Sequence, residues 1–534
     1  MSRARRVPVP VLAATLALAL AVAPGAGLAQ SPPLSSIDWL SDSLADDVAL
    51  RPERRAPPVA TDGTALAPEV TVAPLDAPAP DAVGLVDPAA AGLPPGLWGA
   101  SSTDDIARRL ARLPDRPLPA ARDALKRLLL ARLDPPRGGG TPGVLALARI
   151  DTLLRWGALD EAAALIERAG TDRPELFRRA FDIALLQERE NAACDRLRTA
   201  PGIAPSIPAR IFCLARSGDW AAAALTLETA DALGQVSAEE EALLARFLEL
   251  DDSDGLLPPL PARATVTPLD WRMLEAIGER RSTAGLPLAF AHAELRPTAG
   301  WKARLEATER LVRAGALPPS RLSATHTERA PAASGGVWER VATLQAFEQA
   351  LEAGTPRAVA RALPAAWREM QRAGLGPAFA ALYGARIAAL DLAGPEARLA
   401  HRIALLGPDY EAAALSAPDG ADPLAVALAR GMLPERGPDE MTGEMTAVTG
   451  DDPIAAALAR AFALPVPEAP ARLARLAEDD RLGEALIEAL ATVAVGAQAD
   501  PADLSGALAF LRATGLEDTA RRAALQIRLL GPGR

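Results

Sequence analysis

Two cysteines, Cys194 and Cys213, are the residues whose spacing points most directly to a chemical bond. They lie nine and ten residues from position 203, on either side of a turn marked by Pro201 and Pro205. Residues equally far from the turn between two antiparallel helices face each other, so we expect a disulfide if the chain enters an oxidising compartment. Closing this loop would stabilise the fold by about 3 kcal/mol in the chain-entropy model. The alternative is a pair of inert buried thiols.

The three histidines, His292, His326 and His401, do not form a recognisable metal site. None has a second histidine three or four residues away, so the zinc-protease and zinc-finger patterns are absent. His292 lies in the largely apolar run 286–295. We therefore expect His292 to be a hydrogen-bonded core residue, and we expect no metal ligands.

No catalytic or cofactor motif stands out in the chain. The Gly-x-Ser-x-Gly elbow and the phosphate-binding loop are absent, and Gly374-Leu375-Gly376 lacks a third glycine and a preceding strand. A Ser-His-Asp triad assembled across the fold remains open, because triads need no fixed spacing. The formal net charge of −11 disfavours a nucleic-acid partner. We expect a protein without a cofactor and without enzymatic activity.

Residues 1–29 have the pattern of a secretory signal peptide. Arg3, Arg5 and Arg6 precede an apolar run over 11–22, and small residues before Gln30 predict cleavage between Ala29 and Gln30. The run is shorter than the roughly 20 residues of a membrane span, although an uncleaved anchor is the alternative. No later stretch is long and uncharged enough to span a membrane. Cleavage would lower the net charge to −14, and we expect a periplasmic or secreted protein.

Residues 30–50 resemble a short binding motif on a tether. Ile37, Leu40, Leu44 and Val48 recur at the spacing of one side of a short helix, with aspartates on the polar side. Ile37, Trp39, Leu40 and Leu44 would be the residues that anchor it in a groove. The motif could dock on its own body, bind a separate partner, or bind nothing. Residues 51–96 contain ten prolines and predict an extended, disordered linker.

The body that follows has helical periodicity almost throughout. Trp98 is expected to pack into its start, and Ser102 or Thr103 to cap the first long helix. One helix is predicted over 173–199, between the breaks at Gly170 and at Pro201-Gly202. An acidic and then proline-rich stretch divides the body into two predicted helical lobes, 97–257 and 269–534, joined by a Pro-rich linker over 258–268. Residues 434–450 form an acidic loop, either a surface excursion or a lid.

Short repeats occur where one helix ends and the next begins. Arg155-Trp156-Gly157-Ala158-Leu159-Asp160-Glu161-Ala162 matches Arg216-Ser217-Gly218-Asp219-Trp220-Ala221-Ala222-Ala223 in its glycine and in the residues that open the next helix. Echoes occur at 353–354 and 514–520. These joints resemble those of tetratricopeptide-like repeats, although the full repeat pattern is absent. The resemblance implies an all-α fold, a right-handed α-solenoid of antiparallel helix pairs.

Six tryptophans are spread through this body: Trp156, Trp220, Trp271, Trp301, Trp338 and Trp367. Packing between alanine-rich helices is the favoured interpretation for them. If any of them line a partner-binding groove, Trp301 and Trp338 are the first candidates, because the unusual loop 329–338 lies between them.

These features favour an exported scaffold that binds a protein partner in the cell envelope. One alternative is a cell-wall enzyme or accessory protein associated with peptidoglycan, since superhelical bodies occur in soluble lytic transglycosylases. The chain departs from that family because no lysozyme-like domain with its Glu-Ser motif follows the helices. A second alternative is a periplasmic component or chaperone of a machine resembling the flagellar motor.

Overall fold

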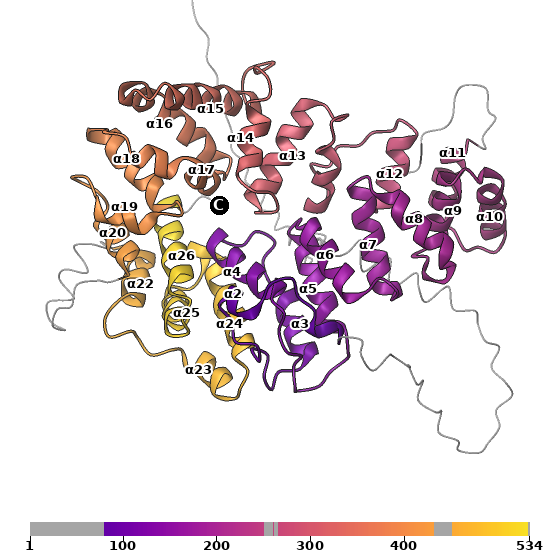
Figure 1. Cartoon of the computed structure of the whole chain (residues 1–534), viewed down its shortest axis with the longest axis horizontal. Coiled ribbons are helices and arrows are strands. Elements are labelled where there is room, and N and C mark those ends of the chain that lie inside the picture. Colours follow the sequence, from indigo (N-terminus) through magenta and orange to yellow (C-terminus); the bar gives the residue numbers. More distant parts are fainter. Residues whose placement is uncertain (1–78, 250–259, 261–264, 432–450, 532–534) are drawn as a thin grey trace, which may run out of the picture. The chain divides into compact units, whose positions relative to one another are not determined.

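Helices make up the regular structure of the described residues (Figure 1). The computed structural model describes residues 79–249, 260, 265–431 and 451–531. Within these ranges the only β-type pairing is an isolated bridge between Val86 and Ala131. The expectation of an all-α chain is therefore confirmed for this part of the molecule.

Several predicted segments lie outside the described residues. They are the signal peptide 1–29, the motif 30–50, residues 51–78 of the linker, most of the linker 258–268, and the acidic loop 434–450. These assignments remain predictions from the sequence.

The first part of the body runs from short N-terminal turns to the helix after residue 265. Proline occupies one of the first two positions of α4, α7 and α12, where its missing N–H leaves no helical bond unmade. The elements are η2 (Pro80–Ala82), α2 (Pro88–Ala91), α3 (Thr103–Ala111), α4 (Pro119–Leu130), α5 (Val144–Arg155), α6 (Leu159–Ala169), α7 (Pro174–Leu186), α8 (Glu190–Thr199), η3 (Pro201–Ile203), α9 (Ile207–Arg216), α10 (Trp220–Ala232), α11 (Ala238–Phe247) and α12 (Pro268–Ala276).

The second part continues as further helices with short connections. Its elements are η4 (Leu288–Glu294), α13 (Trp301–Arg313), α14 (Ser320–His326), α15 (Val337–Glu352), α16 (Pro356–Arg372), α17 (Gly376–Ala388), α18 (Gly394–Leu405), α19 (Tyr410–Leu415), α20 (Pro423–Arg430), α22 (Pro453–Ala461), α23 (Ala471–Glu478), α24 (Leu482–Ala494), η5 (Gly496–Gln498), α25 (Pro501–Ala513) and α26 (Glu517–Leu530).

Glycine joins four of the helix pairs at the positions that the short repeats indicate. Gly157, Gly218, Gly354 and Gly515 have φ angles of 72°, 86°, 65° and 86°. They connect α5 to α6, α9 to α10, α15 to α16 and α25 to α26, and the two helices of each pair pack together. Glycine adopts this left-handed conformation without the steric cost of a Cβ atom. The predicted joints are confirmed.

The single helix predicted over 173–199 is wrong, because the structure divides it into α7 and α8. The break falls at Glu188, whose φ of 57° is uncommon for a residue with a side chain. The Glu188 carboxylate accepts a hydrogen bond of 2.7 Å from Arg296, which lies 108 residues further along the chain. A distant contact holds this turn, so no local glycine or proline marks it in the sequence.

The predicted end of the disordered linker, at residue 96, is also wrong. Residues 79–96 form η2 and α2 and pack against the body. The buried Asp81 carboxylate accepts hydrogen bonds from the backbone N–H groups of Gly143 at 2.7 Å and Ala146 at 2.9 Å, at the start of α5. A carboxylate at this end of a helix satisfies free N–H groups and suits the helix dipole.

Arg149 of α5 fixes the same segment from inside the core. Its side chain is buried, with 1% of the residue exposed. The guanidinium donates to the carbonyl oxygens of Val83 at 2.7 Å, Leu129 at 2.7 Å and Ala131 at 2.9 Å. Burial lowers the pKa of Arg149 to about 10, against the opposing effect of the Asp81 charge. A buried cation with three acceptors explains why a proline-rich segment is ordered here.

The N-terminal segment packs directly on α24. Trp98 is fully buried, as the sequence predicts. The N–H of Gly483 donates to the carbonyl of Leu97 at 3.0 Å, and the N–H of Ala100 donates to the carbonyl of Asp480 at 2.8 Å. A Cβ atom on Gly483 would lie 2.4 Å from Cε3 of Trp98. The indole therefore occupies the space that glycine leaves on α24.

The first long helices also contact the last ones. Helix α4 packs against α24 and α26, and α3 packs against α24; Figure 1 shows these indigo and yellow segments together. The N–H of Leu118 donates to the carbonyl of Ala494 at 2.8 Å, and the N–H of Ala120 donates to Oε1 of Gln526 at 2.9 Å. Each unit of a regular solenoid contacts only its neighbours. The contact of α3 and α4 with α24 and α26 is therefore one that a regular solenoid does not make.

The hydrophobic cores do not follow the predicted lobes 97–257 and 269–534. The largest core includes residues of α3–α7 and α13–α26, together with η4 and Trp271 of α12, on both sides of the predicted linker. A second core is formed by α7–α12, and α12, predicted to open the second lobe, packs against α7 and α11. Proline and acidic residues mark the connection, but they do not determine on which side the next helix packs.

The contact between Trp98 and α24 predicts the effect of a methyl group. Gly483→Ala should lower the free energy of unfolding by about 1–3 kcal/mol, because the added Cβ overlaps the indole. Alanine otherwise favours a helix over glycine by up to about 1 kcal/mol, so a loss must come from the overlap. Urea unfolding measures this change.

Gly202→Ala is the matched control, since no atom lies within 4 Å of the position that its added methyl group would occupy and its φ is not positive. Equal stability of the two variants would contradict this packing.

Candidate functional site

The two tryptophans considered as groove residues pack against each other between α13 and α15. The ring centroids of Trp301 and Trp338 are 5.2 Å apart, and both rings join a small apolar cluster with Leu305 and Val341. Nε1 of Trp301 donates to the carbonyl of Thr325 at 3.1 Å. This placement matches the interior role favoured for the tryptophans, and neither ring lines the cavities beside η4 and α18.

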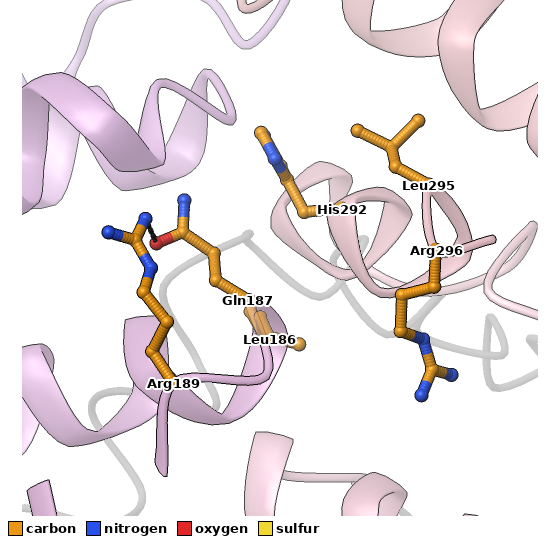
Figure 2. Close-up of a pocket in the computed structure, with 6 residues that line it drawn as sticks. All are labelled: Leu186, Gln187, Arg189, His292, Leu295 and Arg296. Carbon is orange, nitrogen blue, oxygen red and sulfur yellow. Dashed lines mark hydrogen bonds between the residues drawn. The ribbon is translucent and has the colours of Figure 1, made fainter. Parts of the chain in front are cut away.

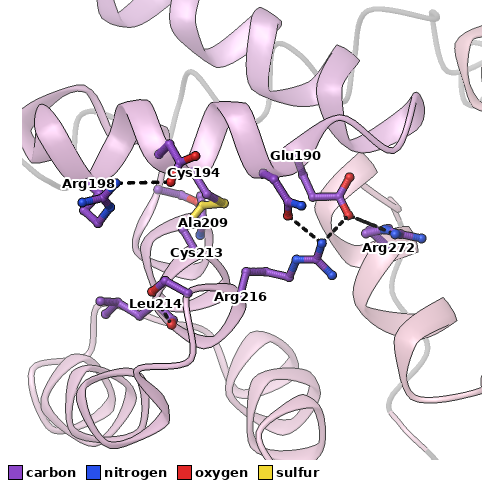
Figure 3. Close-up of a disulfide and its surroundings, with 12 residues drawn as sticks. Glu190, Cys194, Arg198, Ala209, Cys213, Leu214, Arg216 and Arg272 are labelled. Atoms are coloured by element: carbon purple, nitrogen blue, oxygen red, sulfur yellow. Dashed lines mark hydrogen bonds and ion pairs between the residues drawn. A yellow bond between two sulfur atoms is a disulfide. The ribbon is translucent and has the colours of Figure 1, made fainter.

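The structure joins Cys194 of α8 to Cys213 of α9 in a disulfide (Figure 3). Their Cα atoms are 5.1 Å apart, within the range that a disulfide spans. Both residues belong to the second core, beside Phe212. The pairing is the one that their spacing around the turn indicates.

A buried carboxylate lies next to this disulfide. Glu190, at the start of α8, is 2% exposed and faces the guanidinium groups of Arg216 and Arg272 (Figure 3). Nη2 of Arg272 donates to Oε1 of Glu190 at 2.9 Å, and Nη2 of Arg216 lies 3.4 Å from the same oxygen. These ion pairs connect α8 and α9 to α12.

Glu275 of α12 is the second centre of this charge network. It accepts hydrogen bonds of 2.6 Å from Arg272 and 2.7 Å from Arg296. Burial would raise the pKa of Glu275, but the hydrogen bonds and charges of Arg296 and Arg272 outweigh it and lower the pKa. Buried ion pairs of this kind hold elements in one arrangement, here the α7–α8 turn against α12.

A cavity of about 220 Å³ lies between the end of α7 and η4 (Figure 2). Nε2 of His292 lies 2.7 Å from the carbonyl oxygen of Gly157, so this nitrogen carries the proton. Burial lowers the pKa of His292, opposed by that hydrogen bond. Arg296 is committed to Glu188 and Glu275. The cavity is smaller than the roughly 300–1,000 Å³ of most ligand sites. It is open to the surface, and we assign no ligand to it.

His326 is buried in a different network. Its Nδ1 lies 2.9 Å from the carbonyl of Leu322, and its Nε2 lies 3.1 Å from Oε1 of Glu309. Arg340 donates to both oxygens of Glu309 at 2.7 and 2.6 Å. Burial would raise the pKa of Glu309, but His326 and Arg340 outweigh it and lower the pKa. This cluster joins α13, α14 and α15.

The outer face of α10 is the most apolar exposed surface on a single described helix. Trp220 is 51% exposed, Leu225 is 64% exposed and Leu233 is 66% exposed. Ala221 and Ala232 are exposed on the same helix. Apolar side chains on a helix are usually covered, and among the described elements α10 makes its main contacts with α9 and α11.

Trp220 is held in place although it is exposed. Its ring lies 6.4 Å from that of Phe247, and the Phe247 ring stacks 5.6 Å from the buried Phe212. A half-exposed aromatic ring on a rigid support resembles the anchors of protein interfaces. Sequence reasoning assigned Trp220 to the interior. The composition of α10 could have indicated this exposure, because alanine and leucine occur on every side of the helix.

Comparison with protein-family models, characterised proteins and solved structures finds no match to this chain. Across the described ranges, no helix has the length and apolar character needed to cross a membrane. In the same ranges, no group of three or more His, Cys, Asp or Glu side chains is placed to hold a metal ion.

Asp182 of α7 titrates near neutrality. Burial raises the pKa of Asp182 to about 7; the charges of Arg178 and Arg179 oppose this, and the charge of Asp270 adds to it. The pKa in the unfolded chain is about 3.9. The folded state therefore binds the proton more tightly, and stability is lost as pH rises through the window between these values.

Asp182→Asn should remove this loss. Relative to the wild type, the variant should gain about 1–3 kcal/mol in free energy of unfolding at pH 8 compared with pH 5. Urea titrations at both pH values measure it, with Asp391→Asn, at an exposed position after α17, as the control. A variant whose stability relative to wild type is the same at both pH values would refute the raised pKa.

Proposed function

We propose that this protein is an exported, non-enzymatic helical-repeat scaffold that binds a protein partner in the cell envelope. We further propose that its helix pairs stack as a right-handed α-solenoid of tetratricopeptide-like type. The glycine joints of α5–α6, α9–α10, α15–α16 and α25–α26 support this architecture. The sequence pattern of residues 1–29 supports export to the periplasm, and the disulfide between Cys194 and Cys213 suits an oxidising compartment.

The exposed face of α10 is the observation that carries the proposed binding function. Trp220, Leu225 and Leu233 expose apolar surface that water solvates poorly. The disulfide fixes α9, on which α10 packs, so the face is presented on a braced support. A partner with an apolar surface, such as the face of an amphipathic helix, would cover it.

The N-terminal motif would supply a second contact. Ile37, Trp39, Leu40 and Leu44 would be its anchors, before the proline-rich residues 51–78. Two linked contacts bind more tightly than either alone when the linker allows both to engage. The motif and α10 can therefore act on the same partner.

Cross-linking and capture from the periplasmic fraction tests this function. The double variant Trp220→Ser/Leu225→Ser should recover at least about tenfold less of the specific partner than the wild type, because it removes the apolar anchors. Deleting residues 30–50 should weaken capture as well. Mass spectrometry of the purified mature protein should show a chain that begins at Gln30.

Leu415→Ser is the control, since Leu415 is 78% exposed on α19 and leaves α10 unchanged. Undiminished capture by the α10 variant would refute the proposed surface. Release of muropeptides from cell walls by the pure protein would instead favour a cell-wall enzyme.

A further inference from the structure

A second cavity, of about 340 Å³, lies between α18, α26 and the loop that precedes α20. Its size falls within the range of small-ligand sites. The polar residues that line it are Arg398, His401, Arg402, Asp422 and Arg528. Helices α18 and α26 thus place three guanidinium groups around one space, and the residue before α20 adds the carboxylate of Asp422.

The charges around this cavity are not balanced by the described residues. Arg528 donates to Oδ2 of Asp422 at 2.8 Å and lies 3.7 Å from a carboxylate oxygen of Asp452. Oδ1 of Asp422 is occupied by the N–H of Ala425, at 3.2 Å. Among the lining residues, one carboxylate therefore faces three cations.

Arg398 and Arg402 are the two lining cations that form no ion pair with a described residue. Arg402 donates only to the backbone carbonyl of Leu529, and no hydrogen bond or ion pair joins Arg398 to a described residue. They lie one turn apart on α18, where like charges repel by about 0.2–0.5 kcal/mol. Burial lowers the pKa of Arg402; the charge of Asp422 opposes this shift, and the charge of Arg528 adds to it.

His401 does not add a charge to the cavity. Its Nε2 lies 3.1 Å from the carbonyl of Ala413, so this nitrogen carries a proton. Burial lowers the pKa of His401, against that hydrogen bond. The remaining nitrogen, Nδ1, then carries a lone pair. The cavity offers guanidinium donors in excess of its acceptors.

We propose that this cavity binds a small ligand bearing a phosphate monoester group, with Arg398 and Arg402 donating to its oxygens. Arg528 is paired with Asp422 and Asp452, whereas Arg398 and Arg402 form no ion pair with a described residue, so an anionic phosphate would supply the negative charge that these two lack. The planar guanidinium matches pairs of phosphate oxygens in geometry, which makes arginine the preferred phosphate ligand. The phosphate could belong to a soluble metabolite or to a lipid headgroup, and both present the same oxygens.

Isothermal titration of the full mature chain with inorganic phosphate and with glycerol 3-phosphate tests the soluble source. Flotation with vesicles of phosphatidylcholine, with and without phosphatidic acid, tests the lipid source. Arg398→Gln should weaken binding by about tenfold, the usual loss when one charged hydrogen-bond donor is removed. The double variant Arg398→Gln/Arg402→Gln should abolish it.

The single variant guards against loss of the fold, because Arg398 bonds to no described residue, whereas Arg402 holds the end of α26. The matched control is Arg357→Gln/Arg361→Gln, which removes two exposed arginines at the same spacing on α16. It should bind as the wild type does.

Each outcome decides the proposal. Binding of soluble phosphate that Arg398→Gln weakens supports a soluble ligand. Binding only to phosphatidic acid vesicles, with the same sensitivity, supports a lipid. Absence of binding to all probes, or binding that Arg398→Gln leaves unchanged, overturns the site. None of these results depends on the partner proposed for α10.

Discussion

The arrangement of the described helices depends on the contact between the first helices of the body and the last. Its centre is Glu484 of α24, whose side chain is fully buried. Arg109 of α3 donates to Glu484 at 2.8 Å, and Arg481 donates to both carboxylate oxygens, also at 2.8 Å. Burial would raise the pKa of Glu484, but the hydrogen bonds from Arg481 and Arg109 outweigh it and lower the pKa. Removing both arginines would leave the buried charge of Glu484 unpaired, at a cost of about 3–5 kcal/mol.

The described helices contribute to two main hydrophobic cores of different size. Helices α3–α7 and α13–α26 share the largest core, so each is held by segments distant in the sequence. Helices α7–α12 have a smaller core of their own, which the disulfide and the ion pairs of Glu190 and Glu275 reinforce. Helix α10, which carries the exposed apolar residues, packs on the smaller core. Of the helices α7–α12, only α7 and α12 also contribute to the larger core, so a partner can contact α10 without contacting that core.

Local chemistry predicted the helices well, and long-range chemistry explains what it missed. The Ser102 cap, the glycine joints and the opposed cysteines depend on neighbouring residues, and all appear in the structure. The turn at Glu188 and the folding of residues 79–96 depend on Arg296 and Arg149, far along the chain. The exposure of Trp220 and the grouping of Arg398 with Arg528 depend on which helices cover α10 and α18. Periodicity in one sequence carries no information about such contacts.

Native-state hydrogen exchange in increasing urea tests the central contact most directly. If the first and last helices form one unit, amides of α4, α24 and α26 should lose protection in a single opening reaction, while those of α9–α11 open at lower urea. Exchange of α4 together with α9–α11, with α24 and α26 still protected, would contradict this account of the fold.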